Sequence, residues 1–119
     1  MISRTPTANA TGVVASATPV RINSITVRQR SAVAPRLYLQ LIDRASATIG
    51  THAPADVVSI PAGRTEHQSV NKKVEYSGTN GGLQFGTGLV YAVTTDINGS
   101  TNPNAGDEPE VIIDFEPYT

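Results

Sequence analysis

Apolar and polar residues alternate in short stretches from residue 20 onward, and this two-residue period is typical of β-strands with one buried face. The pattern is clearest at residues 37–42, where three leucines alternate with Tyr38, Gln40 and Ile42. Because leucine also favours helices, a helix is the alternative there. Further strands are predicted at 57–60, 83–85, 89–93 and 111–115, and one or two more within 65–76.

The stretch at residues 20–27 changes phase. Val20 and Ile22 alternate, and so do Ile25 and Val27, but the two pairs are out of register by one residue. An extra residue in one strand of an antiparallel pair produces such a slip, so we expect a β-bulge near residues 23–24.

Turn-forming segments separate these stretches. Residues 77–82 contain Asn80-Gly81, a strong hairpin signal, and 95–109 is a long polar loop. Residues 43–56 are loop-like, and we expect at most a single helical turn at 45–49. The sequence therefore predicts an all-β protein built as a single antiparallel β-sandwich of jelly-roll or immunoglobulin-like form, with a partly closed barrel as the competitor.

Residues 1–18 are small and polar and show no periodicity. We expect them to form an extended N-terminal arm, and residues 19–119 to form the β-sandwich domain. The first residues lack the apolar run of a secretory signal, and no stretch approaches the roughly 20 apolar residues that span a membrane. These features predict a protein made in a cytoplasm, or packed into a particle assembled there, without membrane contact.

Candidate chemistry is sparse in the 119 residues. The chain has no cysteine, so disulfides, thiolate metal sites and cysteine nucleophiles are excluded. His52 and His67 are the only histidines and lie in no ligand-spaced cluster. The acidic loop from Asp96 to Asp107 is similar to a calcium loop but has Thr101 where the motif requires glycine. We therefore expect no catalytic, cofactor-binding or metal-binding residues, and no enzyme.

Charge is distributed unevenly along the chain. Residues 1–73 carry nine Lys and Arg against three Asp and Glu, a net charge of +6, whereas residues 74–119 carry seven acids and no base, a net charge of −7. Cross-strand pairing within one sheet is one explanation, and complementarity between neighbouring subunits is the other. On the second explanation, the candidate subunit-interface residues are Arg21, Arg28, Arg30, Asp114 and Glu116.

Two kinds of ligand are disfavoured by the composition. Nucleic-acid binding calls for excess positive charge and stacking aromatics, but the net charge is −1 and aromatic residues make up 5%. Glycan binding usually relies on exposed tryptophan or tyrosine, and the chain has no tryptophan. Its tyrosines are Tyr38, Tyr76, Tyr91 and Tyr118.

Several short motifs resemble a family of small virion structural proteins of tailed phages. In order, these motifs are Arg36–Ala45, Ile49-Gly50-Thr51, Ile60–Gly63, Leu83–Leu89 and Tyr91–Thr94. The match covers about half of the chain, and it departs from the family pattern at Gly86 and in a longer hairpin at 71–80.

The resemblance implies a structural protein of the virion, in its head or its fibres. The polar N-terminal arm and the opposite charges of the two halves favour a capsid decoration (cement) protein that binds and stabilises the outer surface of a phage head. Its expected partners are the major capsid protein and further copies of itself, as a homotrimer on the virion surface. The arm would supply the capsid contacts, through Ile2, Arg4, Pro6, Val13 and Val14. The alternative is a tail-fibre, baseplate or head-fibre module that recognises host-surface glycans.

Overall fold

The computed structural model describes residues 1–63, 70–75 and 83–117, and the regular structure of these residues consists of β-strands without any helix. The strands are β1 (Ile2–Thr5), β2 (Val13–Ser16), β3 (Val20–Gln29), β4 (Leu37–Ile42), β5 (Asp56–Ile60), β6 (Val70–Glu75), β7 (Leu83–Phe85), β8 (Leu89–Thr94) and β9 (Glu110–Pro117). Within these ranges no helix is long and apolar enough to cross a membrane.

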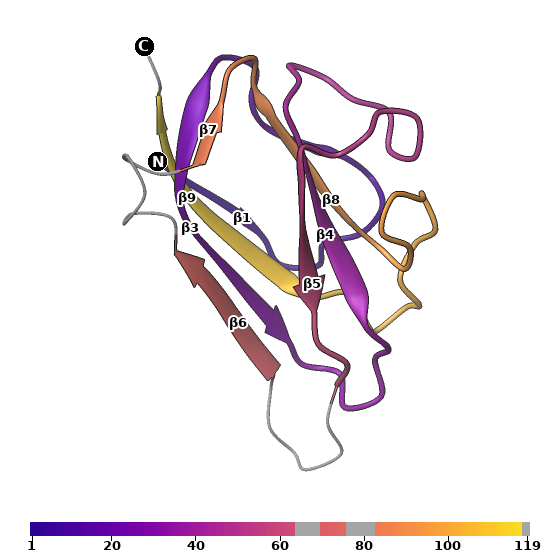
Figure 1. Cartoon of the computed structure of the whole chain (residues 1–119). Coiled ribbons are helices and arrows are strands. Elements are labelled where there is room, and N and C mark those ends of the chain that lie inside the picture. The colour runs from indigo at the N-terminus through magenta and orange to yellow at the C-terminus, as the bar shows by residue number, and fades with distance from the viewer. Residues whose placement is uncertain (64–69, 76–82, 118–119) are drawn as a thin grey trace.

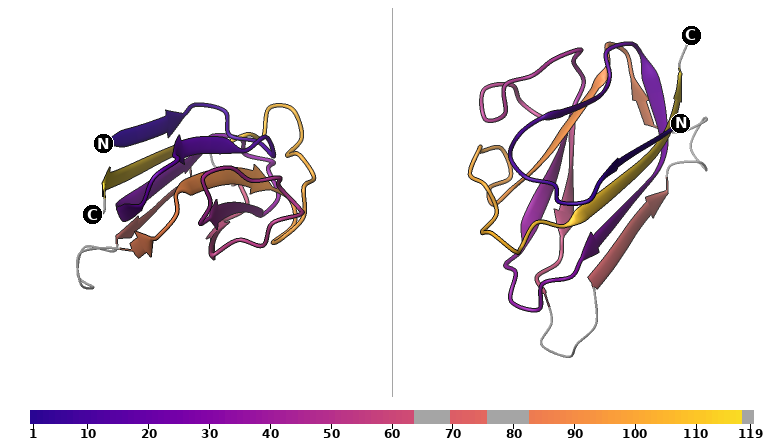
Figure 2. Two further views of the ribbon diagram at one scale, coloured as in Figure 1. Left: turned by 90° about the horizontal axis from the view of Figure 1, so that it is seen from above. Right: turned by 180° about the vertical axis from the view of Figure 1, so that it is seen from behind.

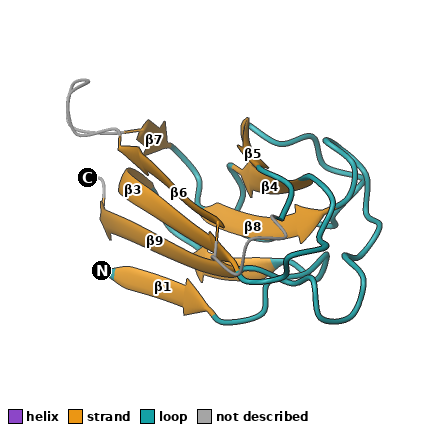
Figure 3. Ribbon diagram, turned by 90° about the horizontal axis from the view of Figure 1, so that it is seen from below, coloured by secondary structure: helices purple, strands orange, loops and turns teal. Residues whose placement is uncertain are grey.

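The strands form two antiparallel sheets that pack face to face (Figures 1 and 3). One sheet has the order β1-β9-β3-β6, with β7 also paired to β3, and the other has the order β2-β8-β4-β5. The edge-on view in Figure 2 shows the two layers. The all-β sandwich predicted from the alternating pattern is confirmed.

The strand pairing distinguishes between the two predicted forms of sandwich. Strands of the first half pair in reverse order with strands of the second half: β1 with β9, β2 with β8, β3 with β6 and β7, and β4 with β5. The chain is thus a long antiparallel hairpin rolled into two sheets, with β6 and β7 sharing one position. This strand order is that of a jelly roll.

The core lies between the two sheets and is built from the alternating residues identified in the sequence. Leu37, Leu39, Leu41, Tyr91 and Ile113 are among the residues with no measurable exposure. The predicted bulge is also present, because the register of β3 against β9 shifts between Ile22 and Ser24. The extra residue allows both alternating pairs of β3 to point into the core despite their change of phase.

The outer face of the β2-β8-β4-β5 sheet is covered by loops. All six residues of β8 are buried, as is Ile42 of β4. Ile49, from the loop after β4, lies against Gly12 together with Val90. The Gln40 amide, which is fully buried, donates to the Thr94 hydroxyl at 2.9 Å and to the Gly99 carbonyl at 3.0 Å. The 95–109 loop is thereby fastened over this sheet.

The expectation of an extended N-terminal arm at residues 1–18 is not confirmed. β1 pairs with β9 in one sheet, and β2 pairs with β8 in the other. The segment between them contributes Ala8 to the core, and the Asn9 carbonyl accepts a hydrogen bond from the Val93 N–H. Both strands satisfy edges that β8 and β9 would otherwise leave open, which explains why a polar segment folds against the sandwich.

The Tyr91 hydroxyl ties β1 to the opposite sheet. It shares hydrogen bonds with Ser3 Oγ at 2.8 Å and with Thr5 Oγ1 at 2.6 Å, and Tyr91 itself is fully buried. Polar residues are therefore accommodated on the inward face of β1.

Replacing Tyr91 by phenylalanine tests this link. We expect the free energy of unfolding to fall by about 1–2 kcal/mol, because two partly buried hydroxyls lose their shared partner. Urea titration measures the change. Tyr38→Phe, at a half-buried tyrosine on β4, is the control and is expected to have a smaller effect. Equal losses in the two variants would contradict the proposed link.

Other predictions about local structure have mixed outcomes. At 48–52 the N–H groups of Thr51 and His52 both donate to the Thr48 carbonyl, forming a turn without a helix. The predicted hairpin turn at 77–82 lies outside the described residues, as do His67, Tyr76 and Tyr118.

Candidate functional site

The outer face of the β1-β9-β3-β6 sheet is open, in contrast to that of the other sheet. Along β3 and β9 the outward residues, such as Thr26, Ile112 and Asp114, are partly exposed. On β1, Ile2 and Arg4 are exposed. Glu110 is the exception among the described residues of this face, since its side chain is 3% exposed. The surroundings of Glu110 therefore contain the one nearly buried carboxylate among the described residues of this face.

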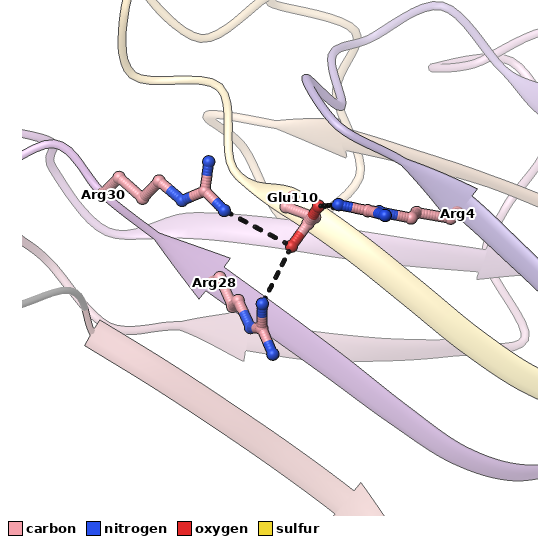
Figure 4. Close-up of polar contacts among 4 residues, drawn as sticks. All are labelled: Arg4, Arg28, Arg30 and Glu110. Atoms are coloured by element: carbon pink, nitrogen blue, oxygen red, sulfur yellow. Dashed lines mark hydrogen bonds and ion pairs between the residues drawn. The ribbon is translucent and has the colours of Figure 1, made fainter.

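Three arginines surround the Glu110 carboxylate, and they come from the two strands that flank β9, namely β1 and β3 with the residue that follows it (Figure 4). Arg4 on β1 donates through Nε at 2.8 Å and Nη2 at 2.6 Å to Glu110 Oε2. Arg28 lies directly opposite Glu110 in the β3–β9 register, with Nη1 at 3.5 Å from Oε1. Arg30, just after β3, places Nη2 at 3.7 Å from the same oxygen. We call these four residues the arginine cluster.

The arginine cluster carries excess positive charge. Three guanidinium groups and one carboxylate give a net charge of +2, and the arginine side chains are 48–66% exposed. The hydrogen bonds from Arg4 hold the pKa of the Glu110 carboxyl below its ordinary value of 4.5, and the charges of Arg30 and Arg28 act in the same direction, while burial opposes them. Glu110 is therefore ionised at neutral pH.

A second ion pair lies toward the other end of the same face. Arg21 Nε is 3.2 Å from Glu116 Oε1, and the Asn23 amide donates to that oxygen, also at 3.2 Å. The interaction with Arg21, followed by that with Asn23, lowers the pKa of Glu116. Arg21 and Glu116 are partners in the β3–β9 register, so this contact follows directly from the strand pairing.

The lowered pKa values predict a loss of stability in acid. Glu110 and Glu116 bind protons less readily when folded than their ordinary value of 4.5 implies for the unfolded chain. Their stabilising contribution is thus present above pH 4.5 and is lost as pH falls through the lowered folded values. We expect a lower urea midpoint at about pH 3 than at about pH 7.

A double variant, Glu110→Gln/Glu116→Gln, is expected to show a smaller difference between the two midpoints. The control Asp96→Asn/Glu108→Gln removes two carboxyl groups that contact no arginine among the described residues, and it is expected to retain the wild-type difference. An unchanged difference in the Glu110→Gln/Glu116→Gln variant would contradict the assignment.

The structure shows where the candidate subunit-interface residues lie. Arg21, Arg28, Arg30 and Glu116 all form ion pairs within the chain, but only Arg21 and Glu116 are paired one to one, since Arg28 and Arg30 share Glu110 with Arg4. Asp114 is half-buried opposite Ser24 and Ile2. A role for these residues between subunits stays a prediction. Glu110, which organises three arginines, was not singled out in the sequence, because its position in the register cannot be deduced from composition.

The candidate capsid-contact residues are dispersed over the first two strands and the link between them. Ile2, Pro6 and Val14 are exposed, and Arg4 belongs to the arginine cluster. Val13 packs against the core instead. Capsid contact by any of them stays a prediction.

The other polar candidates have structural partners. His52 Nδ1 accepts the Thr48 N–H at 2.9 Å, and the Asp107 carboxylate accepts the Ser31 hydroxyl at 2.6 Å. Of the tyrosines that would serve a glycan platform, Tyr91 is buried and Tyr38 half-buried. No group of three His, Asp or Glu side chains suited to holding a metal ion occurs within the ranges that the structure describes.

An open depression lies near the turn that follows β7, and a carboxylate in its lining makes hydrogen bonds that hold this turn. It is lined by Asp43, Arg44, Ala45, Ser46 and Thr87. Asp43 accepts the backbone N–H groups of Gly86, Thr87 and Gly88 at 2.8–3.3 Å. The carboxylate thus holds the 86–88 turn in place.

No family model, curated protein or solved structure matches this chain in comparisons of its sequence and fold. The resemblance to small phage virion proteins accordingly stays a prediction based on the sequence motifs.

Proposed function

We propose that this chain is a phage virion structural protein, a decoration protein that binds the outer surface of a capsid and stabilises it. The observation that carries the proposal is the asymmetry between the two sheets. Loops cover one outer face, whereas the other is open and is charged around the arginine cluster. A protein with one open, charged face is suited to bind another protein surface through that face.

The motifs at 36–45 and 83–94 support the same proposal through their resemblance to phage virion proteins. Jelly-roll domains occur in viral capsids and also in lectins, so the fold is compatible with both the head-surface role and the glycan-binding alternative. Of the two tyrosines in the described ranges, Tyr91 is buried and Tyr38 half-buried, so neither offers the fully exposed ring on which a glycan platform depends, and this supports the head-surface role.

Stabilisation in this role would come from mass action. A protein that binds the assembled shell and not its separated subunits shifts the equilibrium toward the shell. The major capsid protein is the partner in this proposal, and a homotrimer is the proposed assembly. The edge strands β1 and β2, with Ile2 and Val14 exposed, take the place of the free arm as candidate contacts.

Quantitative mass spectrometry of purified virions that carry this gene tests the proposal. Hundreds of copies per particle, with density for the chain over the head in cryo-electron microscopy, are expected. A handful of copies with density confined to the tail would overturn it. Binding of the purified protein to a glycan array, combined with that tail location, would establish the fibre or baseplate alternative.

A further inference from the structure

Arg28 and Arg30 retain most of their hydrogen-bonding capacity. Their guanidinium nitrogens stand 3.5 and 3.7 Å from Glu110 Oε1, and neither donates a hydrogen bond to another described residue. Each guanidinium has five N–H donors arranged to match a carboxylate in bidentate fashion. Both side chains are about half or more exposed, so these donors face solvent.

Glu110 holds the arginines close together without neutralising them. The Arg4 guanidinium occupies Oε2 through two hydrogen bonds, while Oε1 has no hydrogen-bond donor among the described residues. The nearly buried carboxylate therefore acts as an electrostatic anchor between Arg28 and Arg30. Because both guanidinium groups lie beside the same oxygen, at 3.5 and 3.7 Å, one anion is able to contact both of them.

The charge pattern of the open face favours an acidic protein segment over nucleic acid. Among the described side chains, the excess positive charge lies at the end where β9 begins, whereas Arg21 at the other end is paired with Glu116, and Asp114 lies between the two ends on the same strand. A continuous phosphate backbone laid along the face would meet these carboxylates, whereas one or two carboxylate side chains need only the arginine cluster. Charge complementarity thus favours a short acidic protein segment as the ligand of this site.

We propose that Arg28 and Arg30, with Arg4 beside them, form a binding site for carboxylate side chains of an acidic protein segment. The inference deepens the proposed function, on which it rests for the identity of the partner: the segment would belong to the shell protein. Two or more guanidinium–carboxylate contacts at this point would fix the orientation of the open face on the shell.

Nuclear magnetic resonance with the full chain tests the site directly. The probe is a capped tetraglutamate peptide, and the observed signals are the Nε–Hε groups of the arginines. We expect shifts at Arg28 and Arg30, and an increase in Kd of about tenfold or more in Arg28→Gln/Arg30→Gln. The matched control Arg36→Gln/Arg44→Gln has the same change in net charge, but these arginines contact Ser59 and Ser46 elsewhere, and it is expected to bind as wild type.

A second variant separates geometry from charge. Arg28→Lys/Arg30→Lys keeps both charges but lacks the planar fork, so we expect a Kd between those of wild type and the glutamine variant. This variant also keeps the test decisive if the glutamine variant does not fold. Equal weakening in the glutamine variant and its control, wild-type Kd in the lysine variant, or tighter binding of an oligothymidylate of matched charge than of the peptide would each overturn the proposal.

Experiments with virions distinguish this inference from the proposed function. If the wild-type chain decorates heads, Arg28→Gln/Arg30→Gln is expected to dissociate from them at lower salt concentration than Arg36→Gln/Arg44→Gln. Identical release of the two variants from decorated heads would overturn the inference and leave the head-surface role intact. A tail location with peptide binding preserved would overturn the head-surface role and leave the carboxylate site intact.

Discussion

Substitution of Phe85 by alanine is expected to lower the free energy of unfolding by about 3–5 kcal/mol. Phe85 is 1% exposed and belongs to the core between the two sheets. It extends from β7, a strand of three residues that, within the described part of the chain, pairs only with β3 at Val20–Ile22. Removing the ring leaves a cavity that so short a strand and its neighbours can fill only in part, so the loss is a large fraction of the stability of a domain of this size.

Urea unfolding followed by circular dichroism measures this loss. The control is Gln84→Ala on the same strand, whose side chain points outward and is exposed, and which is expected to change stability by no more than about 0.5 kcal/mol. A loss below about 1 kcal/mol for Phe85→Ala would mean that β7 is not anchored in the core.

The strands from residue 20 onward were predictable because their inward residues are apolar. Leu37, Leu39 and Leu41 all point into the core as the two-residue period predicts. The slip in β3 correctly indicated a bulge, because burial of both alternating pairs requires one extra residue.

β1 and β2 gave no such signal, for physical reasons that the structure explains. The inward residues of β1 are Ser3 and Thr5, which reach the Tyr91 hydroxyl instead of an apolar partner. In β2 the inward residues Val13 and Ala15 are only partly buried. Strands of four residues with such inward faces do not show the binary pattern, and their partners are about 75–110 residues away in the sequence.

The jelly-roll pairing brings the two oppositely charged halves of the chain side by side. Since the first half of the chain pairs in reverse order with the second, bases on β1 and β3 come to lie beside acids on β9. Sequence alone showed the two opposite charges but not the register, and so left pairing within the chain and between chains as open alternatives. The register shows in addition that three arginines converge on Glu110, so a net positive charge remains on the open face.

Gly88→Ala is expected to lower the free energy of unfolding by about 2–3 kcal/mol through overcrowding. Gly88 is buried between β2 and the loop after β4, and a Cβ atom there would lie 2.6 Å from the Arg44 carbonyl oxygen and 2.7 Å from that of Ser16. Both neighbours are backbone atoms, so relief requires one of the two segments to move. Thermal and urea unfolding of the variant measure the loss.

Gly86→Ala in the same turn is the matched control, and its expected effect has the opposite sign. A Cβ atom at Gly86 would meet nothing within 4 Å, and its φ angle is not in the left-handed region. Alanine there restricts mainly the unfolded chain, so stability is expected to rise by up to about 1 kcal/mol. Because both glycine N–H groups bond to Asp43, the pair isolates the close backbone approach at Gly88 from the hydrogen bonding of the turn. Equal effects of the two substitutions would show that this approach does not position the turn against Arg44 and Ser16.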